Sequence, residues 1–205
     1  MEAGELRMNA KLSEPLQLSE DFDESMRIAY EYFEAHIFNR VKRPALFEKE
    51  VFVEANEIID DRPVGFWHSV SIEETHHFKN LPCNNDGTME CCKENCVSPF
   101  HQVLIKQKTE TRNICLYRAS RLPWIIDIIK LANRGDPSVQ TWLKPGVGKQ
   151  SKKLYLRYNH YGNDYVIIFS VEKHFFRIIS AFPVFYLKEK RDFEKDSKEY
   201  AWSYY

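Results

Sequence analysis

Three apolar segments in quick succession near the C-terminal end constrain the fold more than any other feature of the sequence. Residues 152–159, 164–173 and 175–187 are rich in β-branched and aromatic side chains, and short turns such as HYGN and KH separate them. Connections this short cannot carry a parallel crossover, which needs about a dozen residues or more. The segments therefore predict three antiparallel strands that follow one another as a meander.

Two other segments have the periodicity of amphipathic helices. In residues 19–40, apolar side chains recur every three or four positions, and Ser19 is a candidate N-cap before an acidic first turn. Residues 120–133 repeat the pattern, with Ser120 as the candidate cap and Pro123 in the first turn. We therefore expect an α+β fold in which a four- or five-stranded antiparallel sheet packs against these two main helices.

The rest of the chain contributes shorter or irregular elements. Residues 100–107 and 112–119 have the composition of strands, and residues 43–72 mix short strands with turns. We expect a loop over residues 137–151 and a charged, helical tail over residues 188–205. The sheet of the predicted fold is then built from the C-terminal half of the chain.

Length and hydropathy place the chain among globular proteins. It has 205 residues, of which 43% are hydrophobic, enough for the core of one domain. It has no run of about eighteen apolar residues that could span a membrane, and its first residues lack the apolar segment of a secretion signal. The sequence predicts a cytoplasmic protein without a membrane partner.

The charges divide the chain into two regions. Residues 1–100 contain 10 Lys+Arg and 20 Asp+Glu, a net charge of −10, whereas residues 101–205 contain 19 and 10, a net charge of +9. We expect an acidic, helical and irregular N-terminal region with a cysteine loop, and a basic α+β core that forms one unit with it. The basic half either binds a polyanion or is attracted to the acidic half.

A loop over residues 76–101 contains four of the five cysteines but lacks the apolar residues of a core. Zinc binds four thiolate or imidazole groups in a tetrahedron, and a reducing compartment favours metal over disulfides. We expect one structural zinc ion, with ligands from Cys83, Cys91, Cys92 and Cys96. Because adjacent cysteines do not easily reach one metal, a histidine can replace one of them: His76, His77 or His101. Redox thiols and disulfides are the other two interpretations.

The sequence does not favour a catalytic zinc. The deaminase pattern H-x-E followed by P-C-x-x-C is absent, and HSVSIEETHH is not the H-E-x-x-H of metalloproteases. A zinc enzyme would also need an open metal position beside a carboxylate base, for which the candidates are Glu73, Glu74 and Glu90. The fifth cysteine, Cys115, lies between Ile114 and Leu116 and is interpreted as a core thiol.

Cationic and aromatic residues alternate in the basic half. Side-chain alternation along a strand places Lys153, Tyr155 and Arg157 on one face. Cations bind phosphates, and aromatic faces stack on unpaired bases. This pattern predicts a nucleic-acid surface that contains Lys152, Lys153, Tyr155 and Arg177.

The same region contains the groups that cleave RNA without a metal. Such cleavage needs a base or another group that activates the 2′-hydroxyl, an acid for the leaving oxygen, and cations for the phosphorane. Candidates are His160, Arg118, Arg121 and Arg157, of which His160 and Arg157 are at polar positions that we expect to be exposed.

The order of these elements resembles the Barnase–EndoU–colicin–RelE superfamily of metal-independent ribonucleases, and most of all its phage-associated branch. The resemblance covers residues 112–187: an arginine-bearing segment before LPWIIDII, a basic strand, the apolar strand YVIIFS and a last strand that ends in ISAFP. It implies an endoribonuclease of toxin or phage–host conflict that cleaves tRNA or another structured RNA, with an antitoxin or immunity protein as partner. On the matching positions it implies site roles for Arg121, Arg157, His160 and Ser180.

Two functions of different classes fit the basic half. One is a metal-independent ribonuclease, and the other is a non-catalytic nucleic-acid or protein binding module stiffened by zinc. Acid–base catalysis requires that Arg157, His160 and Arg121 come within reach of one point. Their arrangement in space therefore distinguishes the two functions.

Overall fold

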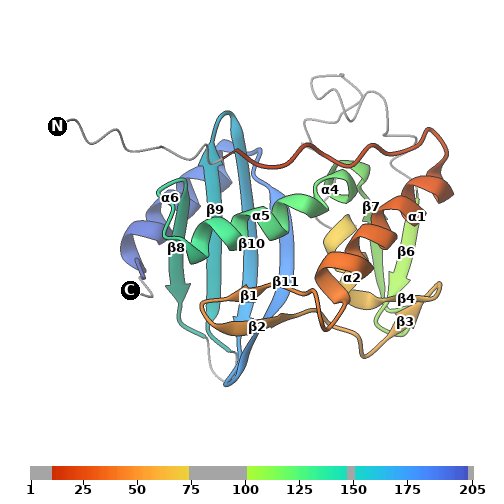
Figure 1. The fold of residues 1–205 in the computed structure, drawn as a ribbon, viewed down its shortest axis with the longest axis horizontal. Coiled ribbons are helices and arrows are strands. Elements are labelled where there is room, and N and C mark those ends of the chain that lie inside the picture. The colour runs from red at the N-terminus through yellow and green to blue at the C-terminus, as the bar shows by residue number, and fades with distance from the viewer. Residues whose placement is uncertain (1–10, 74–100, 147–150, 203–205) are drawn as a thin grey trace.

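A six-stranded sheet lies at the centre of the computed structural model, which describes residues 11–73, 101–146 and 151–202 (Figure 1). The strand order is β1-β2-β11-β10-β9-β8. The bounds are β1 Ala45–Leu46, β2 Lys49–Phe52, β8 Val139–Lys144, β9 Lys153–His160, β10 Asn163–Val171 and β11 Phe175–Pro183. The α+β class and an antiparallel-rich sheet are thus confirmed.

The last three strands are sequential neighbours in this sheet. Strand β10 pairs antiparallel with both β9 and β11. The β9–β10 turn consists of Tyr161 and Gly162, with φ of 50° and 77°. Two successive residues with positive φ match the right-handed twist of a hairpin, so this turn fixes the register that places His160 opposite Asn163.

Two strands differ from the sequence expectations. Strand β8 lies inside the segment expected to be a loop, and it pairs antiparallel with β9. Strand β2 comes from the acidic half of the chain and pairs parallel with β11. The sheet is therefore neither wholly antiparallel nor built from the C-terminal half alone, and one core cluster contains residues from both halves, from Leu12 to Ala181.

The first helical region spans two elements, the α-helix α1 (Phe22–Phe33) and the π-helix η1 (Glu34–Phe38). Its N-cap is Asp21, whose carboxylate accepts from the backbone N–H of Glu24, and not Ser19 as expected. The hydroxyl of Ser19 instead accepts from the backbone N–H of Asp21. Helix α1 packs against the second helical region rather than on the sheet.

The second helical region is also divided. Helix α4 (Leu116–Ser120) and helix α5 (Leu122–Asn133) are separated by one residue, Arg121, which is the C-cap of α4 and the N-cap of α5. The predicted strand over residues 112–119 is therefore wrong beyond β7 (Glu110–Ile114), and Ser120 ends α4 instead of capping α5. The Ser120 hydroxyl donates to the backbone carbonyl of Tyr117.

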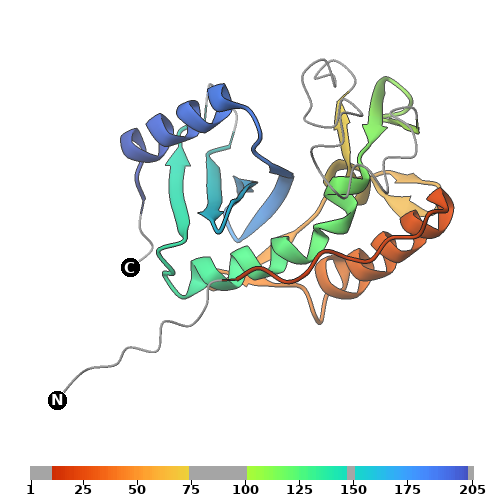
Figure 2. The same ribbon diagram turned by 90° about the horizontal axis from the view of Figure 1, so that it is seen from above.

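Helices cover both faces of the main sheet (Figure 2). Helix α5 lies on one face, and α6 (Leu187–Glu199) lies on the opposite face, over a second core cluster that contains Trp142, Tyr155 and Val166. Smaller elements pack beside α1 and α4: the sheet β5-β7-β6, with β5 Ser71–Glu73 and β6 Gln102–Ile105, the hairpin β3 (Ile58–Ile59) and β4 (Arg62–Pro63), and α2 (Val64–Val70). Within the described residues, no helix is both long enough and apolar enough to cross a membrane.

Candidate anion-binding site

The two covered faces of the sheet separate the residues that the sequence grouped into one site. Arg157 and Ser180 belong to the α6 face, since their strand partners Val166 and Ile168 pack in the α6 cluster. His160 belongs to the α5 face, two residues after the core residue Tyr158. Arg157 therefore does not converge with His160 and Arg121, and the three-residue arrangement predicted for acid–base cleavage is not formed.

Arg157 is fully buried beneath α6. Its Nε and Nη2 donate to the two carboxylate oxygens of Asp164 at 2.8 and 2.7 Å, and its Nη1 donates to the carbonyl of Lys190 at 3.4 Å. A guanidinium and a carboxylate that bind through two parallel hydrogen bonds form a strong, oriented pair. The exposure expected for Arg157 is wrong, because α6 covers the strand face that alternation alone assigns to solvent.

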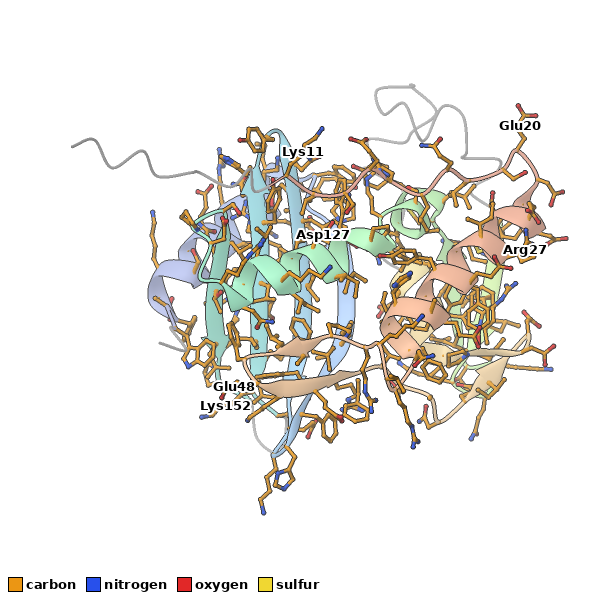
Figure 3. All side chains as sticks on the ribbon, viewed as in Figure 1. Lys11, Glu20, Arg27, Glu48, Asp127 and Lys152 are labelled. Carbon is orange, nitrogen blue, oxygen red and sulfur yellow. The ribbon has the colours of Figure 1, made fainter. Side chains whose placement is uncertain are left out.

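The residues predicted to contact nucleic acid have different environments. Tyr155 is 9% exposed and stacks on Trp142 with ring centroids 4.9 Å apart, so its ring is already occupied. Lys152 and Lys153 are exposed, but Lys152 lies at the end of the sheet opposite to Lys11 (Figure 3). Arg177 is half-buried and forms an ion pair with Glu172 at 3.3 Å. Lys153 and Arg177 each pair with Ser170, one from either side, so these two cations lie on the same face of the sheet, but the Tyr155 ring is not available beside them.

Arg118 and Arg121, at the junction of α4 and α5, are a different case. Nη1 of Arg118 donates to the Ser71 carbonyl at 2.6 Å. Nη1 of Arg121 donates to the Ser120 hydroxyl at 2.8 Å and to the Tyr117 carbonyl at 3.3 Å. Neither guanidinium forms a salt bridge with the part of the chain that the structure describes, and the Nε of each is buried without a hydrogen-bond partner there. We call Arg118 and Arg121 the arginine pair.

Aromatic rings and one phenol surround the arginine pair. The Arg121 guanidinium lies 3.3 Å from the ring centroid of Tyr117 and 4.9 Å from that of Trp124. The hydroxyl of Tyr165 is fully buried and has no hydrogen-bond partner among the described residues. Burial raises the pKa of Tyr165, and the nearby charges of Arg118 and Arg121 act to lower it. The phenol is therefore neutral and supplies no negative charge to the pair.

Arg121 is buried and Arg118 is half-buried, and neither forms an ion pair with a carboxylate of the described residues. Burial lowers the pKa of Arg118, although Cys115, Tyr165 and the carboxylate of Glu189 act to raise it. An uncompensated charge in the interior costs several kcal/mol, on the order of 3–5 when a partner is removed from a buried pair. Cation–π contacts recover about 0.5–2 kcal/mol each, which does not replace a counter-ion. The arginine pair is therefore suited to an anion that comes from outside the chain.

A pocket of about 450 Å³ reaches Arg121 from the surface. One wall is the N-terminal segment 11–15, and the other side consists of Tyr158, Tyr161 and Asn163 from the β9–β10 hairpin. Two hydrogen bonds hold the segment on α5: the backbone N–H of Ser13 donates to Asp127, and Nε1 of Trp124 donates to the Ser13 carbonyl, both at 2.8 Å. We call this the arginine-pair pocket.

Tyr161 and His160 lie at the mouth of the arginine-pair pocket. Tyr161 is 62% exposed, and its ring centroid is 4.1 Å from that of His160. An exposed tyrosine beside a buried arginine offers a stacking surface and a cation to the same ligand. His160 is exposed and adjacent to the pocket, although it does not line it.

The proposed metal ligands Cys83, Cys91, Cys92 and Cys96, together with His76 and His77, lie outside the described residues, so the zinc site stays a prediction. His101 is described, and its ring stacks on Phe22 with centroids 3.6 Å apart. No cluster of three or more His, Cys, Asp or Glu side chains suited to a metal occurs in residues 11–73, 101–146 and 151–202. Cys115 is half-buried at the N-terminus of α4.

Sequence reasoning missed several residues that define the site. Asp164, the partner of Arg157, was detectable, because a two-residue hairpin turn brings it near Arg157. Lys11 and Trp124 gave no such signal, since they come from separate segments. Comparison with protein-family models, with curated proteins and with solved structures finds no match to this chain.

Proposed function

We propose that this protein binds an unpaired strand of RNA in the arginine-pair pocket. One phosphate lies against Arg121, with the charge of Arg118 behind it, and a neighbouring base stacks on Tyr161. The observation that carries the proposal is Arg121, which is 8% exposed, lacks a salt bridge within the described chain and lines a pocket open to solvent.

The chemistry of the pocket supports a nucleotide over a simple inorganic anion. Arginine binds phosphate oxygens through two hydrogen bonds, and stacking of one base on an aromatic ring is worth about 1–3 kcal/mol. Lys11, from the N-terminal segment, also lines the pocket, where it forms an exposed and therefore weak ion pair with Glu14 at 3.3 Å. A pocket with cations and a tyrosine offers both kinds of contact to one nucleotide of a single strand.

RNA cleavage is a second candidate function, and one observation favours it. His160 adjoins the pocket, and histidine is the side chain that most often serves as a general acid or base in catalysis. Arg157 has no part in such a reaction, because Asp164 and α6 occupy its guanidinium. Cleavage would therefore depend on His160 and Arg121.

Binding is tested by fluorescence anisotropy with a labelled RNA decamer in EDTA. We expect Arg121→Met to weaken binding about tenfold or more, the loss expected for one charge-assisted contact. Arg121→Lys keeps the charge, so its affinity for RNA should lie between those of wild type and Arg121→Met. Arg134→Gln is the matched control, because Arg134 is exposed at the other end of α5. The RNA affinity of this variant should stay within about twofold of wild type.

Two results separate the candidate functions. Recovery of intact RNA after incubation, with affinity that falls steeply with salt, supports binding alone. Fragments that form in EDTA and disappear in His160→Ala support cleavage. Affinity that is unchanged in folded Arg121→Met would contradict both, since both depend on a phosphate at Arg121.

A further inference from the structure

A second pocket lies between the π-helix η1 and strand β2. It has a volume of about 590 Å³, and its lining shares no residue with that of the arginine-pair pocket. Ile37, Phe38 and Phe52 are among its apolar lining residues. Small-ligand sites commonly have this size, with apolar walls and a few convergent polar groups.

Three cations line the same pocket: Arg40, Lys42 and Arg43. The Arg43 side chain is 11% exposed, its guanidinium lies 3.9 Å from the Phe52 ring centroid, and its buried Nε has no hydrogen-bond partner in the described residues. Its Nη2 is 3.3 Å from a carboxylate oxygen of Glu50, whose side chain is 62% exposed. Exposed ion pairs of this kind are weak, about 0–1 kcal/mol, so Glu50 neutralises Arg43 only in part.

The local backbone holds these cations at the pocket. The backbone N–H of Arg43 donates to the Asn39 carbonyl at 2.8 Å, and that of Val41 donates to the Asn39 side chain at 2.9 Å. This turn directly follows the π-helix η1, and π-helical turns occur frequently at functional sites. Arg40 and Lys42 are exposed and form no ion pair with the described parts of the chain, and Glu34 is the one acidic residue in the lining.

We propose that this pocket binds a small organic anion with a flat apolar body. The phosphate or carboxylate group of the ligand contacts Arg43 with Arg40 or Lys42, and its apolar body lies against Ile37, Phe38 and Phe52. The proposal does not depend on RNA binding, because the two pockets have separate linings. Charge and apolar contact are both required, which distinguishes this ligand class from inorganic anions.

The test is an NMR titration of the ¹⁵N-labelled protein with phenyl phosphate, benzoate and inorganic phosphate. The backbone amides of Ala35 and Val53, two lining residues, report on this pocket alone. We expect phenyl phosphate or benzoate to shift these amides with a millimolar dissociation constant, and the stronger of the two identifies the anionic group. Inorganic phosphate should bind about tenfold more weakly, because it gains nothing from the apolar wall.

Two variants should change the affinity in opposite directions. Glu50→Gln should strengthen binding of phenyl phosphate or benzoate about two- to fivefold, since it removes the competing carboxylate. Arg43→Met should weaken it about tenfold. Arg191→Gln, an exposed residue on α6, is the charge-matched control and should not change it.

Several results would overturn the proposal. One is that neither phenyl phosphate nor benzoate shifts the amides of Ala35 and Val53. Another is that inorganic phosphate binds as tightly as the organic anions, and the third is that Glu50→Gln binds them with the affinity of wild type. Because Glu50 is exposed, Glu50→Gln keeps the test decisive even if Arg43→Met does not fold.

Discussion

Arg157 and Arg121 are both buried arginines on or beside the same sheet, yet their surroundings differ in one respect. Arg157, under α6, has both oxygens of Asp164 within 2.8 Å of its guanidinium nitrogens. Arg121, beside α5, has neutral oxygens and aromatic rings as its contacts. The first arginine is therefore complete within the fold, whereas the second retains a charge that the described chain does not balance.

This difference shows that burial alone does not separate structural from functional arginines. Both residues lie in the basic half of the chain, and the sequence pattern alone does not distinguish them. The partner decides the role: a buried charge with a bidentate carboxylate stabilises the fold, and one without a carboxylate is suited to an external anion. The predictions below test this distinction.

The largest expected effect is on the paired arginine. Arg157→Met should lower the free energy of unfolding by about 3–5 kcal/mol, because it leaves the buried Asp164 carboxylate with only the Lys190 ammonium, at 3.9 Å, as a cationic partner. Urea denaturation followed by circular dichroism measures this change. The double variant Arg157→Met with Asp164→Leu should recover most of the loss. If Arg157→Met lowers the free energy of unfolding by less than about 1 kcal/mol, the Asp164 pair does not stabilise the fold and Arg157 resembles the unpaired arginines.

The next effect concerns the mouth of the arginine-pair pocket. Tyr161→Ala should weaken RNA binding by about 1–3 kcal/mol, the value of one stacked base. Its stability should change by less than about 0.5 kcal/mol, because the side chain is 62% exposed. Leu187→Ala, at an exposed residue on α6, is the control. Equal affinity of Tyr161→Ala and wild type would remove Tyr161 from the site.

The smallest effect concerns Arg112, a third buried arginine, which is paired with Glu110 at 2.7 Å. Burial acts to raise the pKa of Glu110, but hydrogen bonds from Lys106 and Arg112 outweigh it, so this pKa is lowered. A carboxylate with a lowered pKa stabilises the fold above its unfolded pKa, and this stability is lost as the pH falls through the folded pKa.

Glu110→Gln should therefore reduce the loss of stability between about pH 5 and pH 3 by about 0.5–1 kcal/mol. Urea denaturation at several pH values measures the slope. An unchanged slope would show that the Arg112 pair contributes nothing to acid sensitivity, against the distinction between paired and unpaired arginines.

Local patterns in the sequence account for much of the fold. The meander follows from connections too short for a crossover, and the helical regions follow from apolar periodicity. Strand β8 was missed because polar residues and the Pro145–Gly146 pair surround its one fully buried residue, Trp142. The parallel pairing of β2 with β11 joins segments more than a hundred residues apart, and no local pattern encodes it.

The candidate site was predictable only in part. Arg118 and Arg121 were named from the sequence, but alternation along β9 placed Arg157 with Lys153 and Tyr155 on a face that was expected to be exposed. That inference failed because alternation distinguishes the two faces of a strand without showing what covers each of them. Helix α6 covers this face with Phe193, one aromatic residue in a highly charged segment.

The most direct test measures the free energy of unfolding of wild type and Arg121→Met, each without RNA and with the decamer. Without RNA, the variant should be at least as stable as wild type, because it removes a buried charge that lacks a carboxylate partner. With RNA at a hundred times the dissociation constant, wild type should gain about 2.7 kcal/mol and the variant much less. If Arg121→Met instead loses several kcal/mol without RNA, and RNA stabilises both proteins equally, Arg121 is a structural residue like Arg157 and the account is contradicted.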